Sequence, residues 1–407
     1  MIGTWMTRLA TAWLVYRLTH SAWLLGVVGF TGQIPTFLLA PFAGVWVDRW
    51  NRQKVLVWTQ SLAMVQSFAL AALALTHHIV VWEIVALSIM QGLINAFDMP
   101  GRQSFLVEMV EGRDDLASAI ALNSSIVNMA RLLGPSLAGI VISLAGEGAC
   151  FLADGISYIA VIWSLLAMRG LLPRVTRPDR APSMLHELKA GWKYVSEFPP
   201  VRTILLLFAM VSLMGIPYMT LMPVFASKVL NGGAHTLGFL MGAAGCGALA
   251  AAVTLAARKT VLGLGRVIGA SSAVFGIAIV AFSLSRNFWL SAATLVVAGY
   301  GMVLELSASN TIIQTLVTDE MRGRVMSYYT MAFVGMAPFG SLMAGALAQW
   351  IGAPRTLMVT GLCCALGAAW YFTQLKDIRV HMRPIYRELG ILPQNQQELK
   401  AAVAVED

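Results

Sequence analysis

Long apolar runs joined by short polar loops constrain this chain more than any other feature of its sequence. Residues 22–47 carry no charge, and residues 55–82 carry none apart from His77 and His78. A helix of ~20 apolar residues is long enough to cross the hydrocarbon core of a bilayer. The loop between these two runs is so short that the two helices must lie antiparallel as neighbours.

Counted along the whole chain, such runs predict an all-α membrane protein with twelve transmembrane helices. The composition agrees, because 58% of the residues are apolar and only 12% are charged, against about 25% charged in a soluble domain. The predicted spans are residues 2–18, 22–46, 55–75, 79–98, 117–145, 149–168, 201–227, 236–257, 266–284, 288–310, 325–351 and 355–375.

A polar segment after the sixth span divides the chain into two similar halves. We expect an N-terminal six-helix bundle at residues 1–168, a cytoplasmic linker at 169–200, a C-terminal six-helix bundle at 201–376 and a cytoplasmic tail at 377–407. Residues 184–198 of the linker have an amphipathic pattern. Residues 134–139 and 340–345 occupy matching places in the fifth helix of each half, as parallel repeats require.

The basic residues predict the orientation of the chain. The net charge is +8, and 22 of the 28 Lys and Arg residues fall in alternate loops, the linker and the tail. Cytoplasmic loops carry such an excess of cations, so both termini are expected in the cytoplasm of a cell with a bacterial-type inner (plasma) membrane. Because these cations lie between apolar spans, we interpret them as orientation signals and expect no nucleic-acid partner.

The loop after the second span has the pattern G-x-x-x-D-R-x-x-R-x-K, formed by Gly44, Asp48, Arg49, Arg52 and Lys54. Glycine permits close approach of helices, and an aspartate can accept hydrogen bonds from a helix N-terminus. An ordinary positive-inside loop would explain the basic residues alone. The complete pattern resembles the loop signature of the major facilitator superfamily, and that resemblance implies a gate at which Asp48 faces the eleventh helix.

Further motifs resemble the transmembrane secretion effector branch of that superfamily, the branch of enterobactin exporter-like proteins. The resemblance implies the major facilitator fold and secondary active transport. Gly134, Pro135 and Gly139 are similar to a helix-packing motif of antiporters, without its terminal Gly-Gly pair, which favours export. The matching stretches are residues 3–6, 96–102, 121–124, 131–135, 319–327 and 383–386.

The first span is shorter than the others. Only seven residues precede Arg8, and the apolar run ends near Leu18. Members of this branch carry several more apolar residues before the stretch that matches residues 3–6. We therefore expect a start site upstream of Met1, adding roughly ten residues to complete the helix.

A charge at the bilayer centre costs ~2.5–3.5 kcal/mol, and five of the charged residues within the predicted spans need an explanation on this ground. They are Arg8, Asp98, Arg131, Asp154 and Glu305. Asp98 is near the cytoplasmic end of its helix and is expected to hold the gate by pairing with Arg49 or Arg52, although solvation at the interface would also explain it.

The other four are candidates for a substrate or proton site. Arg131 is either a structural arginine or an attractor of anionic substrate groups. Asp154 lies about 7 Å below the outer face by helical rise, where an outward-open cavity could half solvate it. Glu305 is deeper, and desolvation there would favour the protonated form, so it is the best candidate for a proton-carrying carboxyl. A structural pair of Glu305 with Arg8 or Arg131 is the alternative.

These features predict proton-driven efflux of a small amphipathic molecule by alternating access. A symporting importer is the alternative within that class, and a polytopic membrane enzyme is the alternative outside it. Such an enzyme would need clustered catalytic groups, whereas the six histidines are scattered. The sequence carries no phosphate-binding loop and no metal-type cysteine spacing. We expect no cofactor, a proton gradient as the energy source, and a monomer.

Overall fold

The computed structural model describes residues 1–110, 113–168, 184–258 and 260–392, in which all regular structure is helical. Two five-residue π-helical turns, η1 and η2, interrupt helices of the second half. The elements are α1 Ile2–Thr19, α2 Ala22–Arg49, α3 Arg52–Leu75, α4 Val81–Glu108, α5 Arg113–Ala145, α6 Glu147–Ala167, α7 Met184–Glu197, α8 Pro199–Met214, α9 Tyr218–Val224, η1 Phe225–Val229, α10 Ala234–Ala256, α11 Leu264–Leu284, α12 Phe288–Leu316, α13 Asp319–Thr330, η2 Met331–Gly335, α14 Met336–Ile351 and α15 Ala353–Glu388.

Short polar residues set several helix boundaries. Ser21, Asn51 and Asn287 precede α2, α3 and α12, and each side chain accepts a hydrogen bond from a backbone N–H of the first turn. This satisfies a donor that the helix leaves unpaired. The turns before α6 and α15 use Gly146 (φ 80°) and Gly352 (φ 84°), a backbone conformation that side chains disfavour.

Each of the twelve apolar runs forms helix, but only eleven helical segments of the described residues are long and apolar enough to span a membrane. The exception is α1, which has 18 residues and contains Arg8 and Arg17. The prediction of twelve spanning helices is therefore supported for eleven. A second difference is at the predicted tail, because α15 continues through residue 377 to Glu388 and buries Ile378, Met382 and Tyr386.

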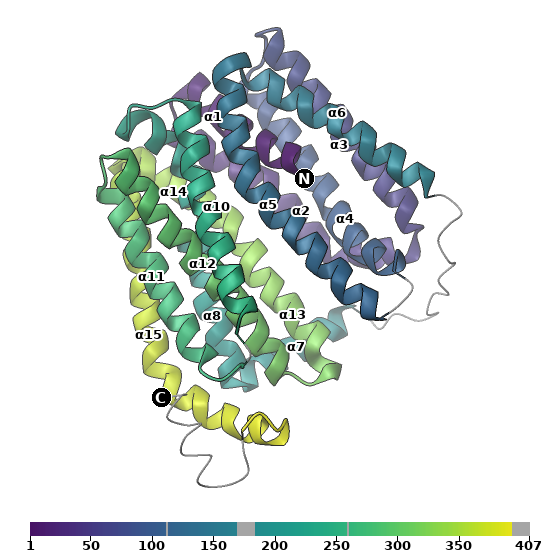
Figure 1. Ribbon diagram of the computed structural model, residues 1–407, viewed down its shortest axis with the longest axis vertical. Coiled ribbons are helices and arrows are strands. Elements are labelled where there is room, and N and C mark those ends of the chain that lie inside the picture. The colour runs from purple at the N-terminus through teal and green to yellow at the C-terminus, as the bar shows by residue number, and fades with distance from the viewer. Residues whose placement is uncertain (111–112, 169–183, 259, 393–407) are drawn as a thin grey trace.

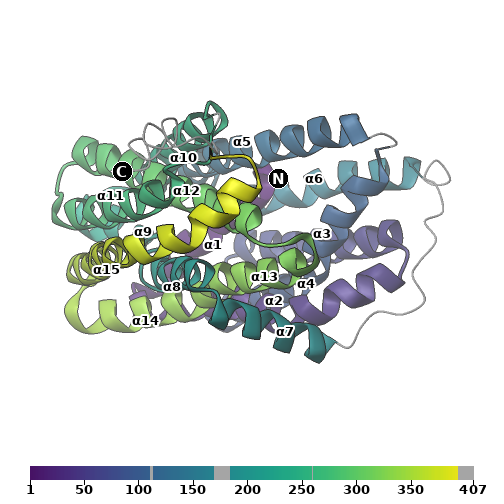
Figure 2. The same ribbon diagram turned by 90° about the horizontal axis from the view of Figure 1, so that it is seen from below.

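The helices form two groups that lie side by side (Figures 1 and 2). One contains α1–α6 and the other α8–α15. We call one end of the molecule the basic end; it carries the turn at residues 50–51, the amphipathic α7 and the turn at residues 317–318. The other is the distal end, with turns at residues 20–21, 76–80, 146, 230–233, 285–287 and 352.

The two groups meet through two helix crossings near the distal end. α5 packs against α10, and α2 packs against α14. Figure 2 shows these two pairs on opposite edges of the interface, and Figure 1 shows the groups separating toward the basic end. The molecule is therefore closed at the distal end in this conformation.

Glycines make both crossings close. A Cβ added at Gly139 of α5 would lie 2.7 Å from the carbonyl oxygen of Ala234, and one at Gly238 of α10 would lie 2.6 Å from that of Pro135. At the second crossing, a Cβ at Gly26 of α2 would lie 2.7 Å from the Ser341 carbonyl oxygen. Small residues are typical of such membrane-helix contacts, because they allow backbones to approach.

At the basic end, α7 lies against the start of the eleventh predicted span. The Tyr328 hydroxyl of α13 donates a hydrogen bond to the Leu188 carbonyl oxygen at 2.9 Å. The Trp192 and Tyr328 rings contact each other at 5.9 Å between centroids. The predicted amphipathic segment is thus a helix that attaches to the second group.

Candidate functional site

Two arginines from different helices meet at one tryptophan. The Arg8 guanidinium carbon lies 5.2 Å from the centre of the Trp5 ring, and that of Arg131 lies 5.5 Å from the same centre. Trp5 and Arg8 lie one turn apart on α1, and Arg131 is on α5. We call these three residues the two-arginine site.

The packing of α1 against α5 fixes this meeting point. A Cβ at Gly134, one turn beyond Arg131, would lie 2.5 Å from the Trp5 Cβ, so a larger residue there would separate the helices. Tyr218 of α9, which belongs to the other group of helices, is close enough to interact electrostatically with Arg131. The site therefore lies where the first group faces the second.

Neither guanidinium has an acidic partner among the described residues. Within the described residues, no carboxylate forms an ion pair with Arg8 or Arg131, and the charged side chain that acts on Arg8 is Arg131. The Arg131 Nε atom is buried without a hydrogen-bond partner, whereas the Arg8 side chain is exposed. Two like charges thus share one aromatic ring.

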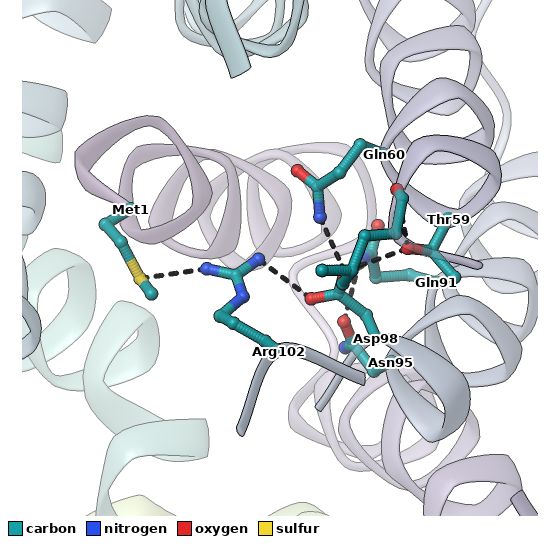
Figure 3. Close-up of polar contacts among 8 residues, drawn as sticks. Met1, Thr59, Gln60, Gln91, Asn95, Asp98 and Arg102 are labelled. Carbon is teal, nitrogen blue, oxygen red and sulfur yellow. Dashed lines mark hydrogen bonds and ion pairs between the residues drawn. The ribbon is translucent and has the colours of Figure 1, made fainter. Parts of the chain in front are cut away.

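Asp98 has a full set of partners on the basic-end side of the first group (Figure 3). The Thr59 hydroxyl and the Gln60 amide donate to its Oδ1 atom at 2.9 and 2.5 Å. Its Oδ2 atom pairs with Arg102 at 2.8 Å. Asp98 is 7% exposed, so solvation does not explain it. The expected pair of Asp98 with Arg52 is wrong for this conformation, because Arg102 lies one helical turn away on the same face.

The loop motif itself is described only in part. Arg52, in the first turn of α3, pairs with Glu108 at the end of α4. The Lys54 backbone N–H donates to the Asn51 side chain at 3.0 Å. The side chains of Asp48 and Arg49, in the last turn of α2, lie outside the described residues.

Gly44 makes no close approach in this conformation. No atom of the described residues lies within 4 Å of a Cβ added at Gly44. The expected role of Gly44 in helix contact is therefore not fulfilled when the distal end is closed.

Asp154 is enclosed by three helices of the first group. The Thr7 hydroxyl of α1 and the Ser67 hydroxyl of α3 both donate to its Oδ2 atom, at 2.9 and 3.1 Å. Gly3 of α1 lies against its Oδ1 atom, which has no hydrogen-bond partner. The residue is 2% exposed. Asp154 is therefore not half solvated when the distal end is closed, and its half-solvation by an outward-open cavity stays a prediction.

Glu305 is buried inside the second group. It is 1% exposed, and its Oε1 atom has no hydrogen-bond partner. The Ser272 hydroxyl of α11 lies next to its carboxyl group. No arginine or lysine of the described residues pairs with it, so the expected pairs with Arg8 and Arg131 do not form here.

The packing-motif residues lie at contacts between helices. Gly134 lies against α1, while Pro135 and Gly139 lie against α10 at the distal crossing. The fifth helix therefore contacts both the helix that carries Arg8 and the opposite group.

Several partners were not predicted from the sequence. Arg102 could have been recognised by its four-residue spacing from Asp98. Trp5, Thr7, Ser67 and Ser272 carry no such signal, because their roles depend on which helices become neighbours. No group of three or more His, Cys, Asp or Glu side chains in the described residues could hold a metal ion.

Comparison with known proteins identifies the family that the sequence motifs resemble. Residues 1–392 match the family described as transmembrane secretion effector. The staphyloferrin A transporter of Staphylococcus aureus is 26% identical over 92% of this chain and 94% of its own length. The multidrug efflux pump Tap of Mycolicibacterium fortuitum is 25% identical over 94% and 95%. The enterobactin exporter EntS of Shigella boydii is 25% identical over 82% and 79%.

Among solved structures, a bacterial homologue of the human lysosomal transporter Spinster, described as inward-facing and unoccupied, has a similar fold. The TM-score is 0.72, with 14% identity over 93% of this chain and 95% of that one. At this identity the likeness supports the fold alone.

Proposed function

We propose that this chain, which belongs to the transmembrane secretion effector family of major facilitator transporters, exports a small amphipathic molecule in exchange for protons. The family and the relatives are transporters, so the chain is a transporter and not an enzyme. The outward direction of transport, its coupling to protons and the siderophore- or drug-like substrate are what we propose. Two of the relatives are an exporter and an efflux pump, which favours this direction.

The observation that carries the proposal is the distal closure by two glycine crossings. Because α5–α10 and α2–α14 meet backbone to backbone, the two groups can separate there as rigid bodies without unfolding a helix. Alternation between closure at the distal end and closure at the basic end would expose a central site to each side in turn. We place the basic end in the cytoplasm by the positive-inside rule.

Proton coupling requires a site whose protonation changes its interaction with substrate or with one of the two states. Glu305 and Asp154 are the candidates. Each is a buried carboxyl with one unpartnered oxygen and no ion-pair partner among the described residues, so it can take up a proton without breaking an ion pair. Asp98 is less suitable, because protonation would disrupt its pair with Arg102. We expect the transporter to act as a monomer.

Transport into inverted membrane vesicles tests the proposal. Vesicles with an acidic interior are supplied with a panel of siderophores, dyes and antibiotics, and accumulation is compared with vesicles that lack the protein. We expect accumulation of at least one compound, and its loss when nigericin collapses the pH gradient. Accumulation only in right-side-out vesicles with an acidic exterior would instead identify a symporting importer.

A further inference from the structure

The two-arginine site has more positive charge than its protein surroundings explain. An arginine inside a membrane protein is normally paired with an acid or with backbone carbonyl groups. In the described residues, neither Arg8 nor Arg131 makes such a hydrogen bond or ion pair, and the Nε atom of Arg131 is buried without a partner. A purely structural role would leave these donors unused.

The cation–π contacts with Trp5 offset only part of the free-energy cost of holding two unpaired guanidinium groups inside the protein. A cation over an aromatic ring is stabilised less than an arginine inside the membrane is destabilised by losing its water. The second guanidinium on the same ring adds repulsion between like charges. A bound anion would reverse that repulsion and supply acceptors for the free N–H groups, because a guanidinium binds an oxyanion through two parallel hydrogen bonds.

We propose that Arg8 and Arg131, positioned by Trp5, bind the anionic group of an amphipathic organic anion, such as a carboxylate or a sulfonate. Calling this ligand the substrate rests on the proposed transport function, whereas the binding itself does not. The exposed Arg8 side chain is accessible to a ligand, and Tyr218 of the opposite group lies near Arg131. A bound anion would therefore lie between the two groups of helices.

Lipid headgroups carry the same oxyanion chemistry as a dissolved solute. The site lies between the two groups, where α1 packs against α9, and Tyr218 of α9 is only 1% exposed. We therefore assign the site to a solute.

Equilibrium binding to the purified full chain in phosphatidylcholine nanodiscs tests the site. The probes are pyrenebutyrate and its uncharged methyl ester, with binding to empty nanodiscs subtracted. We expect the wild type to prefer the acid. Arg8→Gln and Arg131→Gln should each weaken acid binding by about tenfold or more, the effect of losing a charged hydrogen bond, and should leave ester binding nearly unchanged.

Three controls accompany these variants. Arg286→Gln removes the same charge from an exposed turn at the distal end and should not change the preference. Arg8→Lys and Arg131→Lys keep the charge and should retain part of the acid preference even if the glutamine variants fold poorly. Anionic phosphatidylglycerol added to the nanodiscs should not displace the acid.

Equal wild-type affinity for acid and ester, unchanged acid affinity in both glutamine variants, or displacement by phosphatidylglycerol would each overturn the assignment. The binding and transport experiments together distinguish a failure of the anion-site assignment from a failure of the transport proposal. Loss of acid binding in the variants without any transport in vesicles would refute the transport proposal alone. Proton-driven export of an anion that persists in both glutamine variants would refute the anion site alone.

Discussion

Three of the buried carboxylates, Asp98, Asp154 and Glu305, differ in how completely the protein satisfies their oxygen atoms. Asp98 accepts hydrogen bonds from two side chains and pairs with Arg102, whereas Asp154 and Glu305 each keep one oxygen without a partner. Protonation of Asp98 would break its ion pair with Arg102, whereas Asp154 and Glu305 can take up a proton without breaking an ion pair within the described residues. This contrast favours a structural role for Asp98 and a coupling role for one of the other two.

Glu305→Gln is predicted to uncouple transport from the proton gradient. Glutamine has nearly the same size and can still hydrogen-bond to Ser272, so folding and substrate exchange should persist. Because the amide cannot carry the proton, accumulation driven by a pH gradient should fall to the level seen without a gradient. Counterflow exchange and gradient-driven uptake, measured in the same proteoliposomes, separate these two effects.

Glu197→Gln is the matched control, because Glu197 is exposed at the end of α7. It should leave both measurements unchanged. Wild-type accumulation by Glu305→Gln with the same pH dependence would place the proton site elsewhere, and Asp154→Asn would then be the next variant to measure.

At the scale of single residues, the sequence pattern identifies the charged residues inside the spans but not the side chains that they contact. A charged residue in an apolar run can be recognised from the sequence, and so can a partner four residues away on the same helix, as Arg102 is for Asp98. The meeting of Arg8 and Arg131 at Trp5 depends on α1 lying against α5. Likewise, Arg52 pairs with Glu108 because α3 lies beside α4. These neighbours are set by tertiary packing, which the pattern of a single sequence does not specify.

At the scale of elements, the internal repeat of the chain explains the distal crossings. Residues 134–139 and 340–345 were recognised as equivalent in sequence, and each segment provides one side of a crossing. Gly139 lies against α10, and Gly345 lies against Gly26 of α2. The repeat therefore supplies two related contacts, one on each edge of the interface (Figure 2).

Gly26→Ala is predicted to open the distal end. The added Cβ would lie 2.7 Å from the Ser341 carbonyl oxygen and 3.0 Å from the Gly345 Cα, so backbone must move. Overpacking of this kind costs about 1–3 kcal/mol, and a cost confined to the distal-closed state shifts its population by roughly 5- to 150-fold. Double electron–electron resonance between spin labels on His78→Cys and Arg286→Cys should show longer distances.

The matched control lies on the same helix. A Cβ at Gly32 would be 3.7 Å from its nearest neighbour, an ordinary contact, so Gly32→Ala should leave the distance distribution unchanged. The native residues Cys150, Cys246, Cys363 and Cys364 are replaced by serine in all labelled proteins. An unchanged distribution in Gly26→Ala would mean that the α2–α14 crossing does not maintain the closure.

The positions of the helices followed closely from the apolar runs, whereas their irregularities did not. Hydrophobic length predicts where a span lies, because the bilayer requires it. The π-helical turns η1 and η2 have no signal in the apolar pattern; at η2, Ser212 of α8, 121 residues away in the chain, donates a hydrogen bond to the Phe333 carbonyl oxygen at 2.6 Å. The continuation of α15 beyond its apolar part depends on the residues that bury its last turns.

At the scale of the whole molecule, two groups of helices are joined by two close crossings at the distal end, and the proposed transport requires a second closure at the basic end. The structure has the distal closure. The carboxyl candidates for coupling lie one in each group, Asp154 in the first and Glu305 in the second, while the two-arginine site lies where the groups face each other. A change of charge at any of these positions can therefore bias the relative orientation of the groups.

Distance measurements at both ends of one protein test this central claim most directly. Labels on His78→Cys and Arg286→Cys report on the distal end, and labels on Met109→Cys and Ala257→Cys report on the basic end; all four positions are exposed. Purified protein in nanodiscs is measured at neutral and acidic pH, with and without pyrenebutyrate. Alternating access predicts that every condition that lengthens the distal distance shortens the basic-end distance. Distances that change in the same direction, or at one end only, would contradict it.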